Sequence, residues 1–159
     1  MRIPPLLIIW LSIGCALVLQ VMPMPLQLDV FRPNWLLLTV MYWCLALPHR
    51  FNVGSAWLCG ILLDALWGAP IGINGVIFAL VCSFVIKNFQ RIRSYSIWQQ
   101  AVIAGGISLV YQATSYFIQR ALFDVSLIEG YYYSALTSII FWPWLFFLLR
   151  KTRRHWQVA

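Results

Sequence analysis

Long apolar runs, separated by short polar or proline-containing breaks, dominate the chain. A helix needs about 20 mostly apolar residues to cross the hydrocarbon core of a bilayer, and shorter runs suffice where the bilayer thins. The runs predict spans at residues 6–22, 34–47, 51–68, 70–86, 97–118 and 131–149. The first run stops before Pro23 and Pro25, which cannot continue a helix. We therefore predict an all-α integral membrane protein built as a six-helix transmembrane bundle.

Helix-breaking residues occur in two places, between the third and fourth predicted spans and inside the last one. Residues 51–86 hold two short runs broken around Gly68-Ala69-Pro70, so either two full spans or one re-entrant hairpin fits the pattern. Two spans are favoured, because irregular backbone exposed to lipid is not tolerated. In the last run, Pro143 is expected to kink the helix.

The composition agrees with a membrane location. Of the 159 residues, 62% are hydrophobic and only 9% are charged, whereas soluble domains average about 25% charged residues. No polar linker divides the chain, so we expect a single transmembrane domain over residues 1–159 with a basic tail at 150–159. The four cysteines lie in apolar runs without a CxxC pair, and we interpret them as packing residues.

The net charge of +7 comes from short basic clusters between the apolar runs. This distribution is typical of the cytoplasmic edge of a membrane and argues against nucleic acid as a partner. With six spans and the N-terminus inside, Arg32 and Arg120 are the only basic residues that lie outside. The cytoplasmic basic residues are then Arg2, Arg50, Lys87, Arg91, Arg93, Arg150, Lys151, Arg153 and Arg154. We predict that both termini are cytoplasmic and that the tail contacts anionic lipids.

Residues suited to catalysis are sparse. His49 and His155 both lie beside arginines in predicted cytoplasmic segments, where most histidines are ordinary interfacial residues. No HExxH, GxSxG, P-loop or paired intramembrane carboxylate occurs in the sequence. We predict that the protein is not an enzyme and has neither a metal site nor a cofactor.

Asp64 is the one acid well inside a predicted span. An ionised Asp in the middle of a membrane helix costs about 2.5 to 3.5 kcal/mol, so such residues usually face protein or water. Asp64 could accept hydrogen bonds from the turn between Gly68 and Asn74, contact a partner helix, or carry protons or ions. The turn-bracing role is favoured. For that role, we expect Asp64→Asn to be tolerated and Asp64→Leu to fail.

Small residues surround Asp64 at four-residue intervals, and residues four apart share one face of a helix. Small side chains let helix backbones approach closely in lipid, where apolar burial no longer drives association. Packing within the bundle and packing against another protein fit this ladder equally well. The candidate positions for helix packing or partner binding are Ala56, Gly60, Asp64, Gly68, Gly72, Asn74 and Gly75.

The segment FRPNW, residues 31–35, opens the second predicted span on the outer side. Arg32 could reach lipid phosphates there, and Trp35 suits the aromatic belt of a membrane interface. Together with Pro33 and Asn34, these residues complete the set of candidate site positions. The segment alone assigns no function.

Several motifs in the chain, taken together, resemble those of the MreD family of bacterial rod shape-determining proteins. The resemblance is densest in Phe31-Arg32-Pro33-Asn34-Trp35, in Leu47-Pro48-His49-Arg50 followed by Asn52-Val53-Gly54, and in the ladder from Gly60 to Gly72. Trp98-Gln99-Gln100 and Trp142-Pro143-Trp144 extend it towards the C-terminus. Each motif is weak alone, but their order and spacing together are specific.

This resemblance implies a noncatalytic scaffold in the bacterial inner membrane that binds MreC and helps to position peptidoglycan synthesis. The wider assembly would include MreB, RodZ, RodA and the partner transpeptidase of RodA. The family is also similar in architecture to the substrate-binding subunits of energy-coupling-factor transporters. A small-molecule-binding subunit of a membrane transporter is the alternative function. The sequence neither supports nor excludes the handling of lipid-linked precursors.

Overall fold

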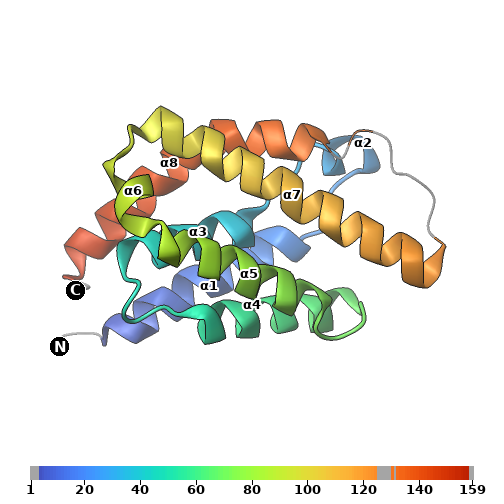
Figure 1. Ribbon diagram of the computed structural model, residues 1–159, viewed down its shortest axis with the longest axis horizontal. Coiled ribbons are helices and arrows are strands. Elements are labelled where there is room, and N and C mark those ends of the chain that lie inside the picture. The colour runs from blue at the N-terminus through green and yellow to red at the C-terminus, as the bar shows by residue number, and fades with distance from the viewer. Residues whose placement is uncertain (1–3, 125–129, 131, 158–159) are drawn as a thin grey trace.

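The computed structural model describes residues 4–124, 130 and 132–157, and every regular element among them is a helix. Figure 1 shows the longer helices lying beside one another, with their axes roughly along the long axis of the molecule. They are α1 (Pro5–Val21), α2 (Leu26–Asp29), α3 (Trp35–Ala46), α4 (Val53–Trp67), α5 (Ile73–Lys87), α6 (Phe89–Ser94), α7 (Ile97–Phe123) and α8 (Tyr132–His155).

The six longer helices overlap the six predicted spans, whereas the sequence did not indicate the short helices α2 and α6. Two helices, α7 with 27 residues and α8 with 24, are long and apolar enough to cross a membrane. The helices α1, α3, α4 and α5 are apolar but shorter. The fold is therefore that of an all-α membrane protein, and the crossing of the membrane by all six helices stays a prediction.

Helix ends in the structure follow local capping chemistry. At the start of α7, the Ser96 hydroxyl accepts from the Gln99 amide while the Gln99 side chain accepts from the Ser96 amide, which is a capping box. This helix continues to Phe123, beyond the predicted end at residue 118. Helix α8 continues to His155, so residues 150–155 of the predicted tail are helical.

Helix α3 lies at the centre of the bundle. All of its residues from Leu36 to Leu45 are buried, and it packs against α1, α4, α5, α6, α7 and α8. Its Trp43 is fully buried, and the indole Nε1 donates to Ser12 Oγ of α1 at 2.8 Å. Because neighbours surround α3 on every side, its sequence is apolar throughout rather than on one face.

Two helix pairs, α4–α5 and α7–α8, pack most extensively. In the second pair, a Cβ at Gly105 would overlap the Ile139 side chain, so glycine permits the close contact between α7 and α8. Helix α8 changes direction along its length (Figure 1), and Pro143 lies inside it. Proline removes one backbone hydrogen bond of a helix, which accounts for the bend.

The bundle has two distinct ends (Figure 1). Helix α1 begins and α8 finishes at one of them, which also carries α6 and the connection from α3 to α4; we name it the terminal end. The turn between α4 and α5, together with α2 and the last turns of α7, lies at the other, which we name the hairpin end.

Candidate functional site

The Asp64 side chain is fully buried and binds the turn that follows its own helix. Its Oδ2 accepts from the Gly72 amide at 2.9 Å, and its Oδ1 accepts from Asn74 Nδ2 at 2.7 Å. The backbone N–H of Asn74 donates to both oxygens, with its nitrogen 3.3 Å from Oδ1 and 3.2 Å from Oδ2. Both carboxylate oxygens therefore hold the start of α5 against the end of α4.

Gly68 and Gly72 do not extend the helical ladder predicted from their spacing. Gly68 caps the C-terminus of α4 with φ +66°, and Gly72 precedes α5 with φ +109°. Glycine adopts these left-handed conformations without the penalty that a Cβ brings. The two glycines shape the turn that Asp64 binds, and the helical ladder consists of Ala56, Gly60 and Asp64 alone.

Gly60 lies where α4 packs closely on the start of α5. A Cβ at this position would lie 2.5 Å from Asn74 O and from the N and Cα atoms of Gly75. Such a distance is far shorter than a normal contact between carbon atoms. The small-residue face of α4, which also includes the buried Ala56, is therefore used for packing inside this chain.

The contacts of Asp64 continue through Asn74 into α7. Asn74 Oδ1 accepts from the Tyr111 hydroxyl at 2.8 Å and from Ser115 Oγ at 3.4 Å. Residues from α4, α5 and α7 are thus joined through one amide side chain. We name the group formed by Asp64, Gly72, Asn74, Tyr111 and Ser115 the hairpin network.

Arg32 binds the end of α1 rather than standing free to reach lipid phosphates. Its Nη1 donates to the Gln20 carbonyl and its Nη2 to the Met22 carbonyl, both at 2.7 Å. The Nη2 atom also lies 2.7 Å from Asp29 Oδ1, and the Arg32 side chain is only 13% exposed. The planar guanidinium fork suits such multiple acceptors, so Arg32 fixes the connection between α1 and α3.

Asn34 ties this connection to α7 and α8. Its side-chain Nδ2 donates to Ser108 Oγ, and its backbone N–H donates to Ser138 Oγ at 3.3 Å. The two serine hydroxyls are themselves 3.3 Å apart, and all three residues are buried. Asn34 therefore links the start of α3 to both α7 and α8.

The two neighbours of Asn34 complete the predicted FRPNW site. Pro33 is buried, and its carbonyl accepts from the Trp35 amide at 2.9 Å. The Trp35 ring makes edge contacts with Phe141 and Trp144 of α8, at centroid distances of 5.1 and 6.3 Å. These contacts direct Trp35 towards the bundle, in addition to any role in an aromatic belt.

A pocket of about 270 Å³ brings the FRPNW segment close to the end of α4. Two of its buried polar atoms, Arg32 Nε and Gln112 Oε1, have no hydrogen-bond partner among the described residues. The lining residues are Gln20, Asp29, Val30, Arg32, Asn34, Trp67, Gln112 and Ser134. Arg32 and Asn34 are therefore neighbours of α4 in space, whereas Asp64 faces α5 instead.

The polar face of α7 was not predicted from the sequence. Ser108, Tyr111, Gln112 and Ser115 follow one another at the spacing of residues that share a helix face. Polar side chains within a membrane helix usually face protein, and this spacing was therefore a usable signal. Helix α7 contacts Asn34 through Ser108 and belongs to the hairpin network through Tyr111.

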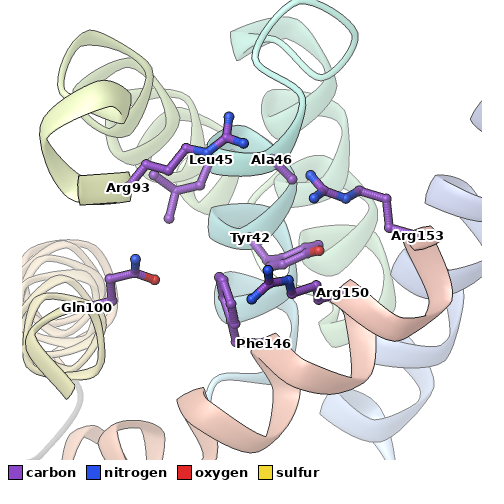
Figure 2. Close-up of a pocket in the computed structure, with 8 residues that line it drawn as sticks. All are labelled: Tyr42, Leu45, Ala46, Arg93, Gln100, Phe146, Arg150 and Arg153. Carbon is purple, nitrogen blue, oxygen red and sulfur yellow. The ribbon is translucent and has the colours of Figure 1, made fainter. Parts of the chain in front are cut away.

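A pocket of about 190 Å³ lies at the terminal end, and we name it the arginine pocket. Like the polar face of α7, this site was not predicted from the sequence. Figure 2 shows the guanidinium groups of Arg93, Arg150 and Arg153 around Tyr42, with Gln100 facing them from α7. The complete lining is Tyr42, Leu45, Ala46, Arg93, Gln100, Phe146, Arg150 and Arg153.

The chemistry of these sites is hydrogen bonding and close packing. Within residues 4–124, 130 and 132–157, no group of three or more His, Cys, Asp or Glu side chains is arranged to hold a metal ion. The four cysteines are free thiols, and three of them are buried. Structure and sequence together define an all-α membrane protein whose candidate site residues join and pack its helices.

The sequence profile of the family described as rod shape-determining protein MreD matches residues 1–152, so the chain belongs to the MreD family. The rod shape-determining protein MreD of Haemophilus influenzae is 27% identical over 139 residues, covering 87% of this chain and 86% of that protein. No solved structure shows significant similarity to the chain. The family prediction is confirmed, the resemblance to energy-coupling-factor subunits stays a prediction, and the transporter alternative has no support.

Proposed function

We propose that the protein is a noncatalytic scaffold of the bacterial inner membrane that maintains rod shape by binding MreC and positioning peptidoglycan synthesis. The match to the MreD family over residues 1–152 carries this proposal. The polar side chains of the hairpin network join three helices, which suits a rigid framework on which a partner can bind.

The proposed contact surface for MreC is the outer face of α1. The ladder on α4 is occupied by α5, because Gly60 packs directly on Gly75. On α1, a Cβ added at Gly14 would meet no atom within 4 Å, and this open position lies among large apolar side chains. A small residue on such a face lets a partner helix approach closely in lipid. The residues of this face are Leu7, Trp10, Leu11, Gly14, Cys15, Val18 and Leu19.

Two glycines allow a matched test of this surface. Gly14 on α1 and Gly106 on α7 both have open space where a Cβ would lie. We expect Gly14→Leu to reduce co-purification of MreC and to impair rod shape in complemented cells, while Gly106→Leu preserves both. Normal MreC recovery with Gly14→Leu would reject the α1 surface. Absence of all MreC binding in the unmodified protein would reject the scaffold itself.

Crosslinking can locate the partner independently. A photo-reactive amino acid at Leu11 or Val18 should crosslink to MreC, whereas one at the exposed α4 residue Leu62 should not. Crosslinks confined to Leu62 would move the contact to α4. Either crosslinking pattern is interpreted only for labelled proteins that still support rod shape.

We also propose that both termini are cytoplasmic, from the distribution of basic residues. A cysteine at the exposed position 124 should react with an impermeant thiol reagent from the periplasm, and one at the exposed position 90 should not. The unsubstituted protein, with its four cysteines, supplies the background. The reverse labelling pattern would overturn the orientation.

A further inference from the structure

The positive charges of the arginine pocket are not balanced by any carboxylate of the described residues. Arg93 comes from α6, while Arg150 and Arg153 come from α8. Among the described residues, no carboxylate forms an ion pair with any of these three; the ion pair that the structure contains is between Arg32 and Asp29. Like charges repel when they are held together, so a counter-ion in the pocket would stabilise this arrangement.

Two buried polar side chains also face the pocket, and each has one atom without a hydrogen-bond partner among the described residues. Tyr42 and Gln100 are only 2% and 4% exposed, yet the Tyr42 hydroxyl and Gln100 Oε1 have no hydrogen-bond partner in the described part of the chain. Buried polar atoms are normally paired, so such exceptions require an explanation. A ligand that accepts from Tyr42 and donates to Gln100 would supply both missing bonds.

Neighbouring side chains hold these two groups in position. The Tyr42 ring packs edge-on against Trp43 and Phe146, at centroid distances of 5.3 and 5.5 Å. Gln100 Nε2 donates to the Tyr95 carbonyl at 3.2 Å, which leaves its oxygen available to the pocket. The unpaired atoms are therefore part of a built site and do not belong to freely moving surface side chains.

We propose that the arginine pocket binds a phosphate group. Guanidinium groups and a hydroxyl are donors that match phosphate oxygens, and arginine can bind them with two parallel hydrogen bonds. A hydroxyl of the same ligand, either a P–OH of inorganic phosphate or a glycerol hydroxyl of a lipid headgroup, would donate to Gln100 Oε1. The apolar wall formed by Leu45, Ala46 and Phe146 suits a molecule with an apolar part. Basic pockets between helix ends at the membrane boundary bind anionic lipid headgroups, and a dissolved phosphate compound shares the same chemistry. This site is separate from the α1 surface proposed for MreC.

The basic residues nearby provide a charge-matched control. Arg91, Lys151 and Arg154 adjoin the pocket arginines in sequence and are exposed, as Arg93 is, but they do not line the pocket. The triple variant Arg93→Gln/Arg150→Gln/Arg153→Gln and the control Arg91→Gln/Lys151→Gln/Arg154→Gln each remove three positive charges. A general electrostatic attraction would respond equally to both variants, whereas a specific pocket would not.

The test is native mass spectrometry of the purified full-length protein titrated with phosphatidylglycerol. We expect the pocket variant to weaken binding of the first lipid by about tenfold or more, and the control variant by less than about twofold. Equal losses in the two variants would overturn the proposal. Thermal unfolding without ligand establishes that both variants are folded.

The source of the phosphate group is determined by a second arm. The protein is heated with phosphatidylglycerol, with inorganic phosphate or with pyrophosphate, at constant ionic strength. Protection by the lipid alone identifies a headgroup site, and protection by the dissolved anions as well identifies a site open to soluble phosphate compounds. No protection by any of the three would overturn the proposal.

Tyr42→Phe keeps the proposal testable if the triple variant does not fold. This change removes one oxygen that has no partner among the described residues, so the ligand-free protein should unfold at an unchanged or slightly higher temperature. Ligand-induced protection should fall, because one hydrogen bond to the phosphate group is lost. Unchanged protection would exclude the Tyr42 hydroxyl, and with it the proposed site.

Discussion

The hairpin network and the arginine pocket both contain buried polar side chains, but they differ in how completely these side chains are paired. In the hairpin network, both oxygens of Asp64 accept hydrogen bonds, and Asn74 joins them to Tyr111. In the arginine pocket, Tyr42 and Gln100 each have one atom without a partner in the described part of the chain, beside three arginines that form no ion pair there. A fully paired network fixes the fold, whereas an unpaired one retains the capacity to bind a ligand.

The largest effect is expected where the hairpin end is most tightly packed. Gly60→Ala places a methyl group 2.5 Å from backbone atoms of Asn74 and Gly75, which cannot turn aside as a side chain can. We expect a loss of about 3 kcal/mol in the free energy of unfolding, at the upper end for overpacking. Unfolding by a denaturing detergent in mixed micelles measures this loss.

Gly106→Ala is the matched control for this substitution. A Cβ at Gly106 meets no atom within 4 Å, and the residue lies inside α7. Alanine should therefore stabilise this helix by about 0.5 to 1 kcal/mol. Equal effects of the two substitutions would mean that α4 and α5 are not in close contact.

Substitutions of Asp64 test the pairing itself. Asp64→Leu leaves the donors at Gly72 and Asn74 without acceptors and should cost about 2 to 3 kcal/mol. The structure also changes the expectation for Asp64→Asn: because both oxygens accept, an amide nitrogen would face a backbone donor and cost about 1 kcal/mol. If Asn and Leu reduce the stability equally, the negative charge is essential. If neither reduces it, Asp64 does not brace the turn.

Arg32→Lys tests the link between α1 and α3. A lysine cannot bind the carbonyls of Gln20 and Met22 together with Asp29, so we expect a loss of about 1 to 2 kcal/mol. The exposed Arg120 provides the control, and Arg120→Lys should change the stability by less than about 0.5 kcal/mol. Equal behaviour of the two variants would place Arg32 at the lipid surface, as the sequence alone indicates.

The sequence predicted most of the fold because the apolar runs are long and their breaks are clear. The proline pair at positions 23 and 25 separates α1 from α2, and the break around Gly68 separates α4 from α5. The sequence did not indicate α6, since a helix of six residues has too few positions to display a period. The extension of α7 to Phe123 was also missed, because hydropathy marks where lipid ends and not where a helix ends.

The candidate sites were predictable only in part. The sequence identified Asp64 and Gly60, since an acid and a small residue stand out within an apolar run. It placed Gly68 and Gly72 on a helix face, because spacing alone cannot reveal a left-handed backbone conformation. The arginine pocket requires residues from α3, α6, α7 and α8, and no local pattern indicates which parts of these helices meet.

The most direct test applies one substitution, Tyr→Phe, to both sites in the ligand-free protein. Tyr111→Phe removes a hydroxyl that donates to Asn74 at 2.8 Å and should cost about 1 kcal/mol. Tyr42→Phe removes a hydroxyl without a partner among the described residues and should cost nothing. Equal destabilisation by the two substitutions, measured in the same unfolding assay, would contradict the distinction between a paired structural network and an unpaired binding pocket.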